Sequence, residues 1–219
     1  MTHRSFRHIT ALAVAVSAFA AEGCARQPKP LTGLAAGVAQ ARRDSLRYAY
    51  TKADIEFMSG MISHHAQAIV MAKWAPTHGA SPAVIRLTER IINAQTDEIA
   101  MMQGWLRDRQ QPVPDANPKG MRMMMGGVEH VMPMPGMLTD EQMAKLDAVR
   151  GVEFDRHFLT YMIQHHRGAV AMVDQLMANN GAAQDETVFK FSNDVFIDQS
   201  TEIVRMMQMV LEIGGPPPL

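Results

Sequence analysis

The chain has 219 residues, of which 47% are apolar and 20% charged, and its formal net charge is −1. This balance argues against nucleic-acid binding and leaves no polybasic surface for a membrane. Without a terminal leader, the length suffices for one well-cored domain or two very small ones. The single cysteine, Cys24, excludes an internal disulfide, and the 20 methionines are the compositional anomaly.

Residues 1–23 have the pattern of an export signal. Basic residues precede an apolar run from Ile9 to Ala20, which is too short for a permanent membrane span. Cys24 then stands where a lipidated N-terminal cysteine would stand, and signal cleavage near Ala20 or Gly23 is the alternative. We predict a periplasmic or cell-envelope protein, attached to a membrane only through lipid on Cys24, with a tether over residues 24–50.

Start and stop signals predict an all-α domain over residues 51–213. Thr51 and Asp54 have the spacing of a capping box, and Ser81 followed by Pro82 is a strong helix start. No segment shows convincing strand alternation. The predicted helices cover residues 51–75, 81–111, a short stretch from 139, 152–179 and 185–213.

A motif on the first long helix returns 101 positions later on the third, from His64 to His165. A single helix hairpin cannot bury its apolar stripe alone, so repeat one (51–111) and repeat two (139–213) should pack as a four-helix bundle with approximate two-fold symmetry. Residues 112–138 form the long Met-rich crossover loop. The shared residues are Asp54, Phe57, Met61, His64, His65, Ala68, Met71 and Asp155, Phe158, Met162, His165, His166, Ala169, Met172.

Helical spacing places the paired histidines at the buried stripe. Alternating steps of four and three put His64 and His165 near its middle, and His65 and His166 at its edge. An alanine one turn further along leaves space beside each imidazole.

The second and fourth long helices bring polar groups into the same stripe, namely Gln95, Glu98, Gln199 and Glu202. Buried carboxylates and amides are costly unless they are hydrogen bonded, and the histidines are the only other polar groups predicted at those levels. We therefore predict that Glu98 and Glu202 accept hydrogen bonds from imidazole N–H groups and orient the opposite ring nitrogens.

The donor types favour a soft metal. Thioether sulfur selects monovalent copper or silver and imidazole also accepts copper, whereas calcium and magnesium require oxygen ligands. The candidate ligands are Met61, His64, His65, Met71, Met102, Met162, His165, His166, Met172 and Met206, supported by Gln95, Glu98, Gln199 and Glu202. His78 and His157 have no evident partner and are predicted to be surface groups.

The crossover loop is a second candidate metal site, because it is too rich in glycine and proline to pack all its methionines. Its soft donors are Met121, Met123, Met124, Met125, His130, Met132, Met134 and Met137. A hydrophobic lid or a sink for oxidants is the alternative interpretation.

The pattern Asp-x-x-Phe, Met-Ile-x-His-His, Ala-x-x-Met, followed by Gln-x-x-Glu-Ile, resembles the family named domain of unknown function 305, over about 51–106 and 152–209. The resemblance implies a ferritin-like helical bundle, and it implies copper, since the better-understood relatives are exported copper-binding proteins associated with copper tolerance. Gln67 becomes Gly168 and Met101 becomes Arg205, so the second copy is expected to bind differently or more weakly.

Three functions compete. The leading one is a Cu(I) or Ag(I) buffer or carrier that acts in copper transfer or tolerance, with a metal ion and a copper-handling protein as partners. A ferritin-like redox enzyme is disfavoured because the paired Glu-x-x-His spacing of di-iron bundles is absent. The third is a non-metal interaction module whose polar layer fixes helix register. The sequence fixes neither the metal stoichiometry nor the oligomeric state.

Overall fold

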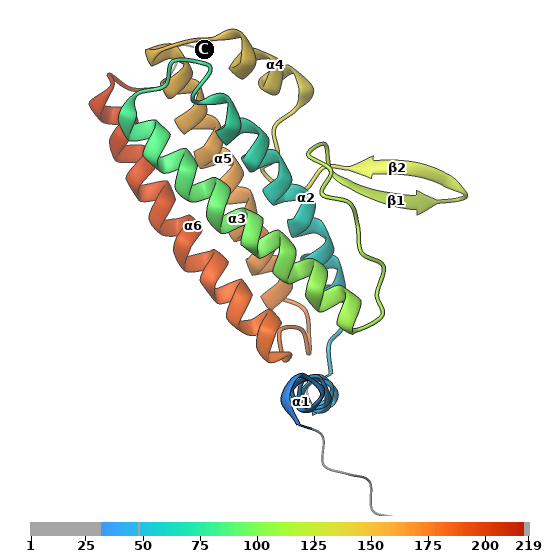
Figure 1. Cartoon of the computed structure of the whole chain (residues 1–219). Helices are drawn as coiled ribbons and strands as arrows, with labels where there is room; N and C mark the ends of the chain where they lie inside the picture. Colours follow the sequence, from blue (N-terminus) through green and yellow to red (C-terminus); the bar gives the residue numbers. More distant parts are fainter. Residues whose placement is uncertain (1–31, 48, 217–219) are drawn as a thin grey trace, which may run out of the picture.

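The computed structural model describes residues 32–47 and 49–216 and is mostly helical. Four long helices, which we call the helical body, lie side by side, and a small two-stranded sheet projects from them (Figure 1). The elements are α1 (Gly33–Arg47), α2 (Lys52–Trp74), α3 (Pro82–Asp108), β1 (Met121–Met125), β2 (Val128–Met132), α4 (Asp140–Ala148), α5 (Val152–Met177) and α6 (Glu186–Glu212).

The described residues include only part of the amino-terminal region. The predicted export signal and Cys24 lie outside them. Residues 33–47, which lie within the predicted tether, form α1, and this helix is set apart from the helical body (Figure 1). Among the described residues, no helix combines the length and apolar character that crossing a bilayer requires.

Local capping determines where the long helices begin. The Thr51 side chain accepts the Asp54 backbone N–H, and the Asp54 carboxylate accepts the Thr51 backbone N–H at 2.6 Å, which completes the predicted capping box. Ser81 caps α3 with Pro82 at the first helical position, also as predicted. The predicted end of this helix near residue 111 is three residues too late, because Gln110 has a φ of 56° and leaves the helical conformation.

The two helix pairs, α2 with α3 and α5 with α6, meet mainly through α2 and α5. The repeated aspartate of the motif links the pairs at their ends. Asp54 accepts the backbone N–H of Ala183 at 2.7 Å in the α5–α6 turn, and Asp155 accepts the backbone N–H of Ser81 at 3.2 Å before α3. Each aspartate therefore fixes the turn of the other repeat to its own helix.

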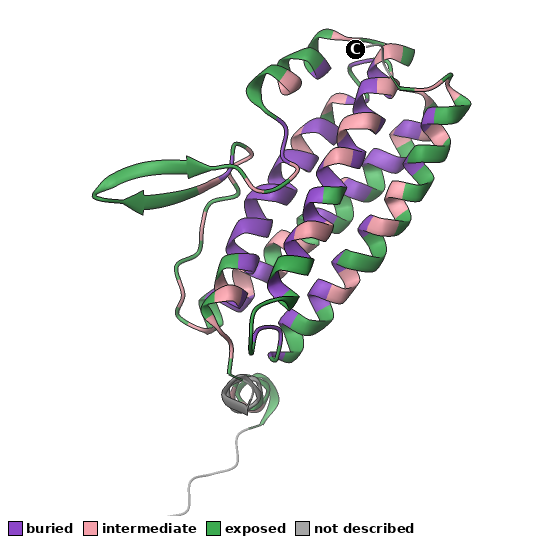
Figure 2. Ribbon diagram, turned by 180° about the vertical axis from the view of Figure 1, so that it is seen from behind, coloured by how far each residue is buried: buried purple, intermediate pink, exposed green. Residues whose placement is uncertain are grey.

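The core divides into two apolar clusters along the length of the helical body. One is centred on Phe57 and Phe191, and the other on Phe154 and Phe158. Figure 2 shows that the buried residues face the interior of the helical body, while the projecting strands are exposed. Amphipathic helices that bury such stripes against one another obtain most of their stability from this packing.

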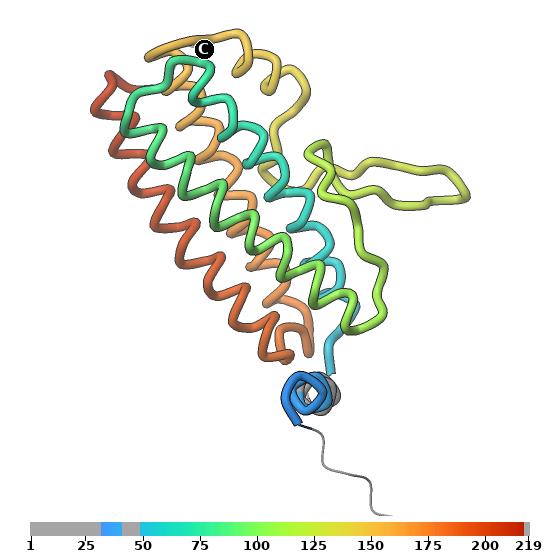
Figure 3. The backbone as a smooth tube through the Cα atoms, viewed as in Figure 1, coloured from blue at the N-terminus to red at the C-terminus, as the bar shows by residue number. Residues whose placement is uncertain are grey.

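Residues 121–132 form a β-hairpin, so the expectation that no segment is a strand is wrong here. Met121 pairs with Met132 and Met123 with His130 in an antiparallel register. Gly126 and Gly127 both have positive φ, 60° and 82°, which is the requirement of a two-residue type I′ turn. The hairpin leaves the path of the chain between α3 and α4 as a projecting ribbon, which is easily followed in Figure 3.

Candidate metal centre

Four histidines occupy the interior of the helical body, and we call them the histidine layer. His64 and His65 come from α2, and His165 and His166 come from α5, and all four are 0% exposed. The rings of His64 and His165 lie 3.7 Å apart between centroids, with planes 35° apart. The pair that helical spacing predicted for the middle of the buried stripe thus meets across the α2–α5 interface.

Each outer histidine has a carboxylate partner on the neighbouring helix of its own repeat. Nε2 of His166 donates to Oε2 of Glu202 at 2.8 Å, as predicted. Nε2 of His65 lies 2.7 Å from Oε2 of Glu98, although its N–H is not aligned on that oxygen as a hydrogen bond requires. Glu202 also accepts Arg90 Nη2 at 2.9 Å, so a cation of the first repeat pairs with the carboxylate of the second.

Burial keeps His64, His165 and His166 neutral. It lowers the pKa of His64 and of His165 well below 6.5, and the neighbouring imidazoles lower both further. Burial also lowers the pKa of His166, against the opposing effect of its hydrogen bond with Glu202. Burial alone would raise the pKa of Glu202, but the contacts with His166 and Arg90 outweigh it and lower that pKa. At neutral pH an ionised carboxylate therefore faces a neutral imidazole.

Nitrogen atoms in this layer are left without protein partners. Among the described residues, Nδ1 of each of the four histidines has no hydrogen-bond partner, and neither does Nε2 of His165. Nε2 of His64 contacts the carbonyl oxygen of Pro135 at 3.1 Å. Because an oxygen faces Nε2 of three rings, the proton belongs on Nε2 and the lone pair on Nδ1. Unpartnered buried nitrogens of this kind are costly unless something else binds them.

The amides predicted to support the layer are buried but not paired through their oxygens. Gln95 is 3% exposed and Gln199 is 5% exposed. Among the described residues, Oε1 of each amide has no hydrogen-bond partner. The polar level therefore spans all four long helices, but the protein itself satisfies only part of it.

The six helical methionines named as candidate ligands divide evenly between the two apolar clusters. One cluster contains one set of three and the other contains its symmetry-related set, and none of the six is more than 6% exposed. The sets are Met61, Met102, Met172 and Met162, Met206, Met71. Thioethers therefore occur in both halves of the core and on all four long helices.

The two repeats have different residues at equivalent positions, Gln67 and Gly168, and the structure gives a reason for the difference. The Gln67 amide donates to the carbonyl oxygens of Pro118 and Leu138 and accepts the Leu138 N–H at 2.7 Å. At Gly168 a Cβ atom would lie 2.0 Å from the carbonyl oxygen of Pro135. The Gln67 side chain bonds to one segment, residues 134–138, and the lack of a side chain at Gly168 lets the same segment pack closely on α5. We call this segment the docked loop.

The crossover methionines do not form one cluster. Met134 and Met137 belong to the docked loop, where the Met134 N–H contacts Met137 Sδ at 3.1 Å. Met124 and Met125 are 69% and 53% exposed at the hairpin tip. Met121 and Met123 line a cavity at the base of the hairpin, and Met132 and His130 stand opposite them in the strand register.

The expectation that His78 and His157 are surface groups is wrong, since each is 4% exposed. His78 contacts Asp147 Oδ1 at 3.0 Å, and its ring stacks on Trp74. Nδ1 of His157 donates to the backbone carbonyl of Glu153 at 2.8 Å, one turn back on its helix. Both lie outside the histidine layer, although Nε2 of His157 has no hydrogen-bond partner among the described residues.

The donor set limits which metals fit. Among the described residues, no three His, Cys, Asp or Glu side chains converge as metal ligands. A centre built on imidazole and carboxylate alone, as in zinc or di-iron proteins, is therefore not preformed here. The unpartnered imidazole nitrogens and the buried thioethers are instead the donor types that soft monovalent metals accept.

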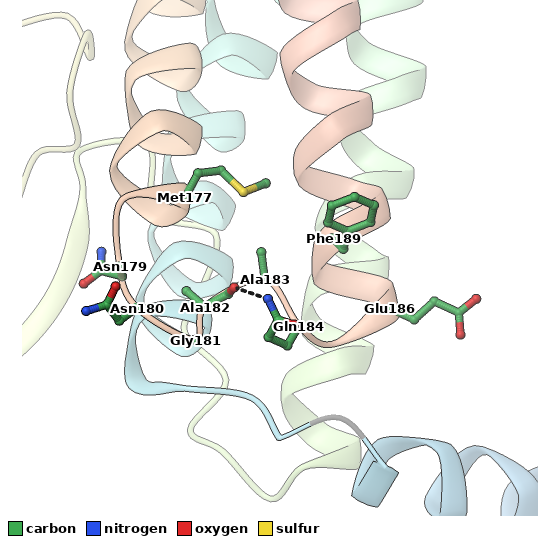
Figure 4. A pocket seen from close by; sticks show the side chains of 9 residues that line it. All are labelled: Met177, Asn179, Asn180, Gly181, Ala182, Ala183, Gln184, Glu186 and Phe189. Atoms are coloured by element: carbon green, nitrogen blue, oxygen red, sulfur yellow. Dashed lines mark hydrogen bonds between the residues drawn. The ribbon is translucent and has the colours of Figure 1, made fainter.

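A separate cavity of about 700 Å³ lies at the α5–α6 turn (Figure 4). It is lined by Met177 and Phe189 and by residues between them. Within this lining, Nε2 of Gln184 donates to the carbonyl oxygen of Ala182 at 3.4 Å. No residue of the histidine layer lines it. The candidate metal chemistry therefore lies elsewhere.

Comparison with known proteins places these features in a family. A family model described as "Domain of unknown function (DUF305)" matches residues 54–210. A DUF305 protein of Streptomyces coelicolor, described as secreted, superposes with a TM-score of 0.64 at 29% identity, covering 76% of this chain and 97% of its own. The protein CopM in its Cu(I)-bound form gives 0.57 at 28% identity, covering 76% and 100%.

CopM has also been solved with other metals. Its Ag-bound form gives a TM-score of 0.56 at 28% identity, with 76% of this chain and 100% of CopM covered. The uncharacterized protein L153 of Acanthamoeba polyphaga mimivirus is 38% identical over 56 residues, which are 26% of this chain. The match spans 37% of that viral protein.

Proposed function

We propose, since this chain belongs to the DUF305 family, that it is an exported protein that binds Cu(I) or Ag(I) through methionine and histidine and acts in copper buffering, transfer or tolerance. The observation that carries the proposal is the histidine layer, in which four buried imidazoles keep Nδ1 unpartnered. CopM, a relative at 28% identity, has been solved with Cu(I) and with Ag bound.

The proposed functional unit is one domain over residues 51–213, a ferritin-like four-helix bundle interrupted by the crossover 112–138. An export signal over 1–23 and a tether over 24–50, with lipid on Cys24, would hold it in the periplasm or cell envelope. The description of the Streptomyces relative as secreted supports the export proposal. A copper-handling protein is the proposed recipient of the metal.

In this proposal both methionine and histidine side chains bind the metal ion. The proposed ligands are the histidine layer and the two methionine sets, Met61, Met102, Met172 and Met162, Met206, Met71. Glu98 and Glu202 hold the Nε2 side of His65 and His166 and present Nδ1 for coordination. The buried thioethers bias the centre toward the monovalent ion.

Titration of metal-free protein with Cu(I) against a competing chelator tests the proposal. We expect tight binding by the wild type and at least tenfold weaker binding by a His65→Asn/His166→Asn variant. A His157→Asn variant is the matched control, because that histidine is equally buried but lies outside the layer. Wild-type protein that cannot compete with the chelator would exclude the function.

The rival is a layer that serves only helix register. It is favoured by the Glu202 contacts, which already satisfy part of the layer without metal. The metal-free melting temperatures of wild type and the His65→Asn/His166→Asn variant separate the two. Register control requires a large loss of stability in the absence of metal, whereas a binding centre requires that metal stabilises the wild type more than the variant.

A further inference from the structure

A cavity of about 250 Å³ lies at the base of the hairpin, between the hairpin, α2 and α5. Four of the residues that line it are methionines from three separate parts of the chain. Met121 and Met123 come from β1, Met134 from the docked loop and Met172 from α5. The fold therefore brings methionine side chains from distant parts of the sequence to the same cavity.

Two of the cavity methionines pack against a glycine in the middle of α2. A Cβ atom at Gly60 would lie 2.7 Å from Met134 Sδ and 3.4 Å from Met172 Cε. Glycine is among the poorest helix formers, so its presence at a buried helical position has a local stability cost. The corresponding residue of the second repeat is Tyr161. The space that admits the two thioethers is therefore a property of the first repeat only.

The pleat of the hairpin places its charged residues, together with Met124, on the face opposite the cavity methionines. Alternate residues of a strand point to the same face, so Met121 and Met123 share their face with the paired Met132 and His130. The ion pair of Arg122 with Glu129, at 3.6 Å, occupies the opposite face. The face that carries the cavity residues thus bears thioethers and one imidazole.

Ordinary packing accounts for Met172, which belongs to the core, but not for the two hairpin methionines. Methionines that fill a core are buried, whereas Met123 is 37% exposed and Met121 is half-buried beside an open hollow. The carboxylate at the rim, Glu56, is paired with Lys52 at 2.8 Å. Calcium and magnesium require several oxygen ligands, while sulfur donors select Cu(I) or Ag(I).

We propose that this cavity is a second soft-metal site, in which Met121, Met123, Met134 and Met172 supply thioether ligands to Cu(I) or Ag(I). The site rests on the proposed function and adds to it a solvent-facing position outside the histidine layer, and this site shares Met172 with the first of the two methionine sets. The docked loop connects the two, because Pro135 lines the cavity and its carbonyl oxygen contacts Nε2 of His64. A metal ion bound at the hairpin is therefore separated from the buried imidazoles by the docked loop alone.

Calorimetric titration of the full chain with Ag(I) tests the site. The variant Met121→Leu/Met123→Leu/Met134→Leu keeps side-chain volume and removes three thioethers. The matched control is Met124→Leu/Met177→Leu/Met207→Leu, which changes three exposed methionines outside the cavity. We expect the cavity variant to lose one Ag(I) equivalent, or to bind it at least tenfold more weakly, and the control to match the wild type.

Two further variants, each with a single substitution, keep the site testable if the triple variant fails to fold. Gly60→Ala introduces the Cβ atom that meets Met134, and Met123→Leu alone changes a partly exposed side chain that the core does not need. Both should weaken the same equivalent, and His65→Asn/His166→Asn should retain it. Ag(I) binding by the wild type with no difference between cavity and control variants overturns the cavity site alone. Absence of any Ag(I) binding by the wild type overturns the proposed function as well.

Discussion

The rings of His64 and His165 lie against each other at the α2–α5 interface, with centroids 3.7 Å apart and no solvent exposure. Two imidazoles at this distance cannot readily both become charged, since burial and mutual repulsion oppose protonation of either ring. The contact joins the two repeats at their motifs. It therefore couples the stability of the fold to the protonation state of the candidate metal centre.

Metal-free protein should lose stability as the pH falls below 6.5. The lowered pKa values of His64 and His165 mean that the unfolded chain takes up protons in this range before the folded chain does. The free energy of unfolding is therefore fully present above pH 6.5 and declines toward the lowered folded-state pKa values. Urea denaturation at pH 7.5 and pH 5.5 measures the decline, and equal midpoints would contradict it.

The packing of the docked loop should depend on the hydrogen bonds of Gln67. Replacing Gln67 with Ala removes its bonds to Pro118 and Leu138 and leaves the buried Leu138 N–H unpaired. We expect a loss of about 1–3 kcal/mol in stability, the usual cost of an unsatisfied buried group. Hydrogen exchange should become faster at Leu138. Unchanged exchange there would mean that other contacts hold the loop.

Two glycine-to-alanine changes should act in opposite directions. Gly168→Ala places a Cβ atom 2.0 Å from the Pro135 carbonyl oxygen, so we expect a loss of about 1–3 kcal/mol through overpacking. Gly104→Ala meets nothing within 4 Å on α3, so we expect a gain of up to about 1 kcal/mol from helix propensity. Chemical denaturation measures both, and equal effects would show that the loop does not pack on α5 as described.

The parts of the fold that follow from local chemistry could be predicted from the sequence. Capping residues at Thr51 and Ser81 mark helix starts within one residue, and helical spacing places His64 and His165 in the core. The contact of Glu202 with His166 also follows from the sequence, because a carboxylate predicted to be buried needs a donor and few donors are at its level, although Glu202 is only half-buried.

What could not be predicted depends on contacts between distant segments. His78 contacts Asp147, which is 69 residues away, and no local sequence pattern predicts that contact. The hairpin was missed because methionine is a weak indicator of a strand, although Gly126-Gly127 was an available turn signal. The four-methionine cavity needed the fold, since Met172 and Met121 lie on different elements.

Glu202 should matter for both stability and metal binding. Replacing it with Ala leaves Nε2 of His166 and one side of Arg90 without their acceptor. We expect a stability loss of about 1.5–3 kcal/mol, the range for hydrogen bonds to charged groups. Cu(I) affinity should fall about 10- to 100-fold, the usual effect of losing the group that orients a histidine ligand.

Glu202→Gln and Glu153→Ala are the informative companions of this change. Glutamine retains an acceptor oxygen and should recover part of the stability, since the His166 N–H still finds a partner. Glu153 forms a solvent-accessible i,i+3 pair with Arg156 at 3.1 Å, so its loss should cost no more than about 1 kcal/mol. If Glu202→Ala weakened Cu(I) binding no more than Glu153→Ala, Nδ1 of His166 would not be a ligand, and the thioethers would have to hold the metal without it.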